Sequence, residues 1–339
     1  MPARPRPIRA LPLVVTVLAP AVVFVAALSV GRYPVSLDAL LSAVAAWARG
    51  DGLGRAQLAL LTIRLPRICL AMMVGAALSA SGAAFQGLFR NPVVSPDLLG
   101  ASSGASFGAS LAILVGSTGA LTQGLSFVFG LAAVLIVAAL SSLVDRRSSG
   151  IVTMILCGML IASMFNAAVS LIKFVADTDT KLPAITYWLM GSLAATRAAD
   201  LSTVWVFAPA CAALAALGWK LNILAMGDEE ARMLGVNVRA YRWLVIACAT
   251  LLTSTAVSVS GNIGWIGLVV PHLARRLTGA DHRRLLPVSM SIGSAFLLLV
   301  DTVARLVFTI EIPLGIITAF IGAPFFFALI LRSRRGFFQ

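Results

Sequence analysis

Three acidic residues stand side by side at Asp228, Glu229 and Glu230, in a chain of which only 12% of the residues are charged. Each acid at a bilayer centre costs roughly 2.5–3.5 kcal/mol on insertion scales, so a run of three belongs outside the membrane. Gly227 and Gly235 bracket the run and predict a short helix, with Asp228 as N-cap and Gly235 at the C′ position. Such a helix is either a solvated loop helix or a docking helix for a partner.

Arginines form the second set of candidate binding groups. Arg64 and Arg67 occur in the sequence RLPR, and Arg305 lies four residues after Asp301. A local ion pair between Asp301 and Arg305 is the simpler interpretation and contributes only a few tenths of a kcal/mol if exposed. Three arginines near one membrane face can instead receive the carboxylates of a partner protein.

The other reactive side chains do not form a catalytic or metal-binding motif. Four cysteines lie far apart inside apolar runs, which is typical of small buried hydrophobes. His272 and His282 have no nearby cysteine or carboxylate cluster, so packing or hydrogen bonding is favoured over metal ligation. The sequence contains no HExxH or GxSxG motif, and no GxxxxGK[ST] loop for ATP. We therefore expect no catalytic residue, no metal site and no bound cofactor in this chain.

Small residues fill much of the segment from 64 to 110. Glycine, alanine and serine run through residues 75–84, and such faces let membrane helices approach closely or line a path. The turn NPVVSP ends one helix and starts the next. Packing accounts for the small residues but not for Gln86 and Asn91 at the expected cytoplasmic end.

Membrane-spanning helices must position these groups. The 339 residues are 60% hydrophobic with a mean hydropathy of +0.98, which predicts an all-α polytopic membrane protein with a single domain over residues 1–339. A span needs about 20 mainly apolar residues, and the eighth predicted segment is too short for a full crossing. About ten spans are predicted, at 11–30, 65–88, 97–115, 123–144, 151–174, 200–219, 243–260, 265–278, 286–308 and 314–331.

The distribution of basic residues predicts the orientation. With a cytoplasmic N-terminus, 17 of the 26 Lys and Arg residues fall on the cytoplasmic side, so both termini are expected inside. Because these residues are scattered between apolar segments, the net charge of +13 does not indicate a nucleic-acid partner. The acidic run then lies in a cytoplasmic loop over residues 220–242.

Three segments resemble the FecCD/cobalamin-type permease family, the membrane subunits of ATP-binding-cassette (ABC) importers for iron–siderophore, haem and cobalamin. They are SGAAFQGLFRNPVVSPDLLGASSGA, GWIGLVVPHLARRLTGADHRRLLP and IPLGIITAFIGAPFFF. The resemblance covers nearly the whole chain and implies ten helices in a bacterial inner membrane and a homodimer whose path follows its two-fold axis. It also implies two cytoplasmic ATPase subunits, which hydrolyse the ATP, and a periplasmic binding protein.

The resemblance implies roles for individual residues. GDEEARMLGVN is similar to the family's coupling-loop pattern, except that Met226 stands where leucine is usual. The expected ATPase-coupling residues are Met226, Gly227, Asp228, Glu229, Glu230, Ala231, Leu234 and Gly235, with Glu229, Ala231 and Leu234 in direct contact. The expected docking residues for the binding protein are Arg64, Arg67 and Arg305. The expected lining of the translocation path is Gly82, Gln86, Asn91, Pro92, Gly100, Ser103 and Gly104.

The substrate is expected to be a metal chelate, because the small, apolar stretch 75–84 offers no ligand set for a free metal ion. Ferric siderophore is preferred on family frequency, while haem, cobalamin and molybdate carriers share the same motifs. A secondary transporter would need intramembrane carboxylates for ion coupling, whereas the acids here lie at predicted helix ends or loops. An intramembrane enzyme would need a catalytic motif that the sequence lacks.

Overall fold

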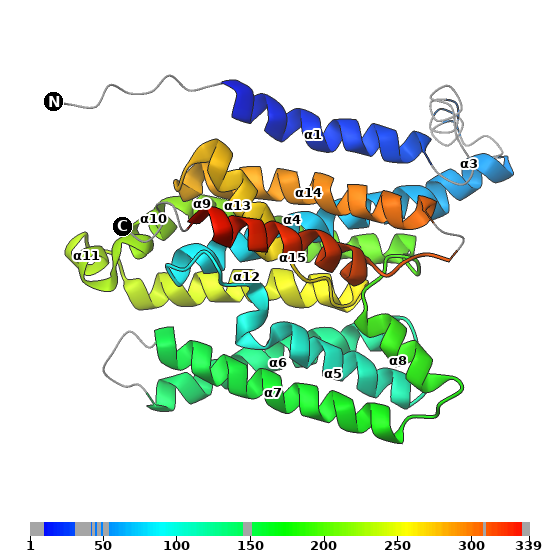
Figure 1. The fold of residues 1–339 in the computed structure, drawn as a ribbon, viewed down its shortest axis with the longest axis horizontal. Coiled ribbons are helices and arrows are strands. Elements are labelled where there is room, and N and C mark those ends of the chain that lie inside the picture. The colour runs from blue at the N-terminus through cyan, green and yellow to red at the C-terminus, as the bar shows by residue number, and fades with distance from the viewer. Residues whose placement is uncertain are drawn as a thin grey trace.

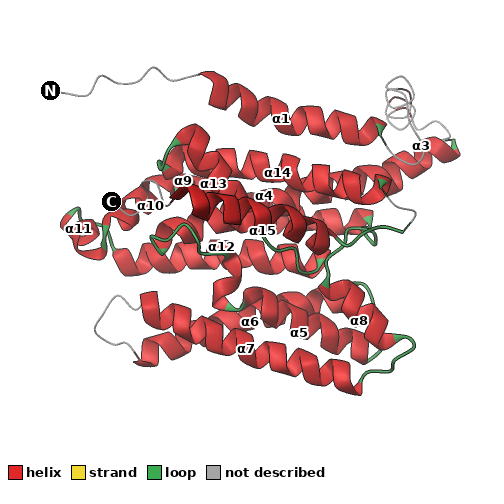
Figure 2. Ribbon diagram, viewed as in Figure 1, coloured by secondary structure: helices red, strands yellow, loops and turns green. Residues whose placement is uncertain are grey.

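The computed structural model describes residues 10–30, 42, 45, 49, 54–144, 151–307 and 310–333. Across these residues the chain is helical, with loops between helices and no strand (Figure 2). The helices are α1 (Ala10–Ser29), α3 (Arg55–Ala59), α4 (Leu65–Leu88), α5 (Ala101–Leu114), α6 (Ala120–Val144), α7 (Ile151–Val175), α8 (Lys181–Leu189), α9 (Val204–Ala216), α10 (Gly218–Met226), α11 (Asp228–Met233), α12 (Val238–Ser260), α13 (Ile266–Thr278), α14 (His282–Leu306) and α15 (Leu314–Ser333). The all-helical prediction is confirmed for the described chain.

Each predicted span coincides with helix, and the largest departures from the expected boundaries occur at three spans. A π-helical turn over Leu60–Arg64 joins α3 to α4, so one continuous helix begins ten residues earlier than predicted, at Arg55. The span expected at 97–115 is broken at Gly100, whose φ of 77° is left-handed and suits glycine. The span expected at 200–219 is divided into a 3₁₀ turn, α9 and α10.

Length separates crossing helices from partial ones. Six described helices are long and apolar enough to cross a bilayer. Helix α13 has 13 residues, which is about 20 Å of helix against a hydrocarbon core of about 30 Å. Seven of the basic residues used for the orientation lie outside the described residues: Arg4, Arg6, Arg9, Arg146, Arg147, Arg334 and Arg335.

Helix α4 is the centre of the bundle because its small residues let neighbouring helices approach closely. A Cβ added to Gly75 would lie 2.2 Å from the carbonyl oxygen of Gly293 on α14. A Cβ at Gly82 would lie 1.8 Å from the carbonyl oxygen of Gly267 on α13. Helix α12 also packs on α4 and extends the contact to α5 and α6, which lie together with α7 (Figure 1). Close packing is thus the role of the small-residue run.

The two ends of the bundle carry different groups. Helix α11 lies at the extreme left of Figure 1, at the end where α1 begins and α15 finishes. Helix α3, the start of α4 and the start of α15 lie at the opposite end. The acidic helix and the arginines of RLPR are therefore separated by the full length of the bundle.

Candidate functional site

Helix α11 is a short helix fixed at both ends by glycine, as predicted. Gly235 has a φ of 73° and its amide donates to the carbonyl of Arg232, while the Val236 amide donates to the carbonyl of Ala231. This pair of bonds is a Schellman motif with Gly235 at the C′ position. The N-cap is Gly227, at a φ of 142°, so the prediction that Asp228 caps the helix is wrong.

Asp228 instead joins α11 to the next helix. Its two carboxylate oxygens accept hydrogen bonds from Nη2 of Arg242 on α12, at 2.8 and 2.7 Å. Both side chains are largely buried, with 13% of Asp228 and 12% of Arg242 exposed. Charge-assisted bonds of this kind are shorter and stronger than neutral ones. Asp228 thus holds the acidic helix in place and is unavailable to a partner.

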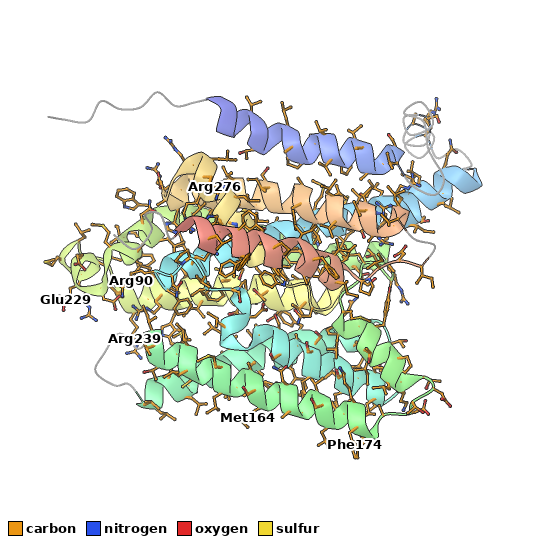
Figure 3. All side chains as sticks on the ribbon, in the orientation of Figure 1. Arg90, Met164, Phe174, Glu229, Arg239 and Arg276 are labelled. Carbon is orange, nitrogen blue, oxygen red and sulfur yellow. The ribbon has the colours of Figure 1, made fainter. Side chains whose placement is uncertain are left out.

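The two faces of α11 have different neighbours. Ala231 is fully buried within the hydrophobic core of the chain, so the prediction that it contacts a partner protein is wrong. Glu229 and Glu230 are exposed, and Glu229 points away from the bundle at its tip (Figure 3). Met226, Met233 and Leu234 are exposed apolar side chains on or beside α11, and of these Met233 was not predicted. Met233 directly precedes Leu234, and its exposure follows from the position of Ala231 on the buried face.

At the opposite end, Arg67 is held by two carboxylates from distant parts of the chain. Its Nε and Nη2 donate to Oδ1 of Asp301, at 2.9 and 2.8 Å. Its Nη1 and Nη2 donate to the two oxygens of Glu311, at 3.0 and 2.9 Å. Only 9% of the Arg67 side chain is exposed. Arg67 is thus occupied by carboxylates of its own chain, its role in docking stays a prediction, and Glu311 was not singled out from the sequence.

Arg305, whose side chain is largely buried, and the half-buried Arg64 complete this charged cluster. Nε of Arg305 lies 3.1 Å from Oδ2 of Asp301, which confirms the local ion pair predicted from their spacing. Its Nη2 donates to Thr302 at 3.3 Å. Nη1 of Arg64 donates to the backbone carbonyl of Leu28 at the end of α1, at 2.7 Å. The three predicted arginines share one end of the bundle, where their charges are partly balanced inside the chain.

The residues predicted to line a path do not share one surface. Gly82 and Gly104 are helix contacts, since a Cβ at Gly104 would lie 2.4 Å from the carbonyl of Phe129 on α6. Gln86 is buried and accepts a hydrogen bond from Arg275 at 3.0 Å. The remaining four differ in exposure: Asn91 and Pro92 are exposed, Ser103 is half-buried and Gly100 is buried. We therefore assign Gly82, Gln86 and Gly104 to packing between helices.

Helix α7 carries an exposed polar stripe that the sequence analysis missed. Ser163, Asn166 and Ser170 recur at helical spacing on one exposed face in the middle of this 25-residue helix. The serines donate to carbonyls of their own helix, whereas the Asn166 amide has no hydrogen-bond partner among the described residues. Met164 and Phe174 on the same helix point away from the bundle in Figure 3. Three polar residues at a spacing of three and four were the available signal.

Both histidines serve packing or hydrogen bonding, as expected. His272 meets the ring of Phe325 edge-on at 6.2 Å between centroids. His282 is buried, and its backbone amide and Nδ1 lie 2.8 and 2.9 Å from Oδ1 of Asn222. No cluster of three or more metal-binding side chains occurs within the described part of the chain.

A cavity of about 420 Å³ lies beside the start of α15. It is lined by Leu189, Met190, Asn262, Gly264, Trp265, Gly315, Ile316, Ala319 and Phe320. Trp265 has a φ of 71°, an uncommon conformation for a bulky residue. The cavity is mainly apolar, with the Asn262 amide as its polar side chain.

The sequence and fold are similar to those of known membrane transport proteins. The model of the FecCD transport family matches residues 18–332. The molybdate import system permease protein MolB of Haemophilus influenzae is 41% identical over 318 residues, which are 92% of this chain and 93% of that protein. The hemin transport system permease protein HmuU of Yersinia pestis is 42% identical over 286 residues, 81% of this chain and 83% of that protein. A solved inward-facing metal-chelate type ABC transporter has a TM-score of 0.83 and 38% identity, covering 94% of this chain and 97% of its own.

Proposed function

The chain belongs to the FecCD transport family of multi-pass inner-membrane permeases, and from this we propose that it carries a metal chelate or metal oxyanion into the cytoplasm with ATPase partners. The observation that carries the proposal is that α11 is fixed to the bundle on one face and exposed on the other. The Asp228–Arg242 ion pair and the buried Ala231 fix this helix, while its outer face remains exposed. A rigid helix beyond the membrane can transmit a partner's motion to the bundle.

Energy for transport comes from a separate ATPase subunit that binds α11. The chain has no P-loop, so it does not bind ATP by that route. The contact surface combines the apolar side chains of Met226, Met233 and Leu234 with the carboxylates of Glu229 and Glu230. Apolar centres with polar surroundings are the usual composition of protein interfaces.

A second copy of the chain lies against the exposed stripe of α7. An asparagine amide in contact with lipid tails would lose its hydrogen bonds to water at a cost of several kcal/mol. Asn166 is therefore better placed against a water-filled path or another protein surface. A homodimer with facing α7 helices would bring two polar stripes together and form a path between the copies, with Asn91 and Pro92 exposed near its cytoplasmic end.

The binding protein docks at the opposite end, where Arg64, Arg67 and Arg305 cluster. Asp301 is the fully buried acid of this region and pairs with Arg67 and Arg305. An ion-coupled secondary transporter would need a carboxylate free to gain and lose its ion. The pairing of Asp301 favours the ATP-driven importer over this alternative.

The relatives support a metal chelate or metal oxyanion as the substrate, and we propose two candidates. Ferric siderophore is the substrate expected from family frequency. Molybdate is the second candidate, because the molybdate permease aligns over 92% of this chain whereas the hemin permease aligns over 81%.

One reconstitution experiment tests the function and the substrate together. The permease is coexpressed with an ATPase subunit and a binding protein from the same organism and reconstituted in proteoliposomes, and uptake of iron and molybdenum is measured by elemental analysis. ATP-dependent uptake of either metal supports the importer, and the metal identifies the substrate. Uptake that persists with the ATPase subunits omitted would show a secondary transporter instead.

A further inference from the structure

The two carboxylates that hold Arg67 differ in how easily they can leave. Asp301 has a fully buried side chain inside α14, so its removal from Arg67 would require α4 and α14 to separate. Glu311 has 29% of its side chain exposed and lies on the non-helical connection just before α15. Of the two partners, Glu311 is the one that can exchange.

The charge of the cluster favours a replacement acid. Within the part of the chain that the structure describes, three arginines, Arg64, Arg67 and Arg305, gather around the carboxylates of Asp301 and Glu311, and Arg305 lies close enough to interact electrostatically with all four. An unpaired buried arginine is strongly unfavourable. Asp301 keeps Arg67 paired while Glu311 leaves, and an incoming carboxylate then restores the second partner.

Glu311 is also one of the contacts that hold the start of α15. The backbone amides of Leu314 and Gly315 donate to the carbonyls of Gly191 and Met190, at 2.8 and 3.0 Å. Met190 and Gly315 line the 420 Å³ cavity. Release of Glu311 would therefore loosen the helix that forms one wall of this cavity.

We propose that Glu311 is a displaceable ion-pair partner of Arg67. When the binding protein docks, one of its acidic side chains replaces Glu311 on Arg67, and the start of α15 is released. The inference rests on the proposed importer function and adds a step to it. Arg67 binds a carboxylate of the binding protein only after Glu311 leaves. Docking of the binding protein is therefore coupled to movement of the cavity wall.

Hydrogen–deuterium exchange tests the restraint in the full-length protein in nanodiscs. Glu311→Gln should raise the exchange rate of the peptide covering residues 310–316 by roughly threefold to tenfold, because the ion pair with Arg67, which anchors the chain just before the Leu314 and Gly315 amides, is lost. Asp179→Asn, a change of an exposed acid in the loop between α7 and α8, is the matched control and should leave this rate unchanged. An unaltered rate in Glu311→Gln overturns the proposal.

A probe of the displacement itself uses a hexaglutamate peptide, with hexaglutamine as the neutral control, at low ionic strength where screening is weak. Hexaglutamate should raise the same exchange rate in the unsubstituted protein and have little further effect in Glu311→Gln. Equal effects of the two peptides, or none from either, overturn the exchange of carboxylates. Uptake in the reconstitution assay is measured separately. If uptake occurs but hydrogen–deuterium exchange does not respond, the Glu311 step is wrong and the importer function stands. If hydrogen–deuterium exchange responds but no uptake occurs, the proposed importer function is wrong and the displacement of Glu311 stands.

Discussion

The carboxylate of Asp228 and the guanidinium of Arg242 lie 2.7 Å apart and join the short acidic helix α11 to the helix that follows it. They lie fourteen positions apart in the chain, with the glycine turn at Gly235 between them. The pair divides three consecutive acids into one that holds the helix and two that face outward. It also gives the first test of how α11 works.

Replacing Asp228 with Asn should lower the stability of the permease by roughly 1–3 kcal/mol, because Arg242 would lose its charged partner in a mostly buried site. Thermal unfolding of the detergent-solubilised protein measures the change. The exposed Glu229→Gln variant is the control and should unfold at the unsubstituted temperature. If Asp228→Asn and Glu229→Gln unfold alike, the ion pair does not fix α11.

Leu234→Asp should weaken association with the ATPase subunit at least tenfold, equivalent to about 1.4 kcal/mol, because a charge would enter the apolar contact. Leu234 is exposed, so the unfolding temperature of the isolated permease should stay the same. Titration of the ATPase onto immobilised permease measures the affinity. Thr178→Asp, exposed in the loop between α7 and α8, is the control, and equal affinity of the two variants would exclude α11 from the interface.

Gly82→Ala should destabilise the bundle by several kcal/mol, because the added Cβ would lie 1.8 Å from the Gly267 carbonyl oxygen and force α4 and α13 apart. Gly124→Ala is the matched control on α6, where an added Cβ meets no atom within 4 Å. There the alanine should be neutral or stabilising, since glycine is the poorer helix former. Unfolding of both variants in detergent is compared, and a stable Gly82→Ala variant would reopen the assignment of this glycine to the path.

Asn166→Leu should reduce uptake of the transported metal by about tenfold while ATP hydrolysis by the complex continues, if the α7 stripe lines the path. The same proteoliposomes provide both measurements. Val128→Leu, an exposed apolar position on neighbouring α6, serves as the control. Full uptake by the Asn166→Leu protein would show that the polar stripe of α7 does not line the translocation path.

The contribution of Asp281 to the stability of the folded protein should decrease at acidic pH. Partial burial opposes its ionisation, but hydrogen bonds from the Asn222 amide and the Arg283 backbone, with the nearby charges of Arg283 and Arg284, lower its pKa below the usual value. A lowered pKa stabilises the folded state fully above the unfolded pKa of about 3.9, and this stabilisation disappears as the pH falls through the lower, folded value.

Asp281→Ala should therefore cost about 1 kcal/mol near pH 7, through the loss of the α14 cap, and progressively less below about pH 4. The difference between the two unfolding temperatures, measured from pH 3 to 7, gives the result. A difference that grows as the pH falls contradicts the lowered pKa of Asp281.

Local features of the sequence were sufficient to locate most of the long helices. Apolar segments of spanning length predicted the positions of α1, α4, α6, α7 and α15, because the lipid solvent imposes its length requirement on each segment separately. The acidic run and Gly235 predicted a short helix outside the membrane for the same local reason. Helix α8 was missed because nine residues beginning with lysine do not have the composition of a span.

The sequence by itself determined the class of the protein, the positions of most of its long helices and the glycine-bracketed helix α11, since these depend on neighbours along the chain. Only the tertiary structure decided the partners of the charged and small residues. Arg67 meets Asp301 across 234 positions and Glu311 across 244, and Gly82 meets Gly267 only when α4 packs on α13. Helix packing sets these contacts, and no spacing along the chain encodes which arginine will be buried and which face of a helix will remain open.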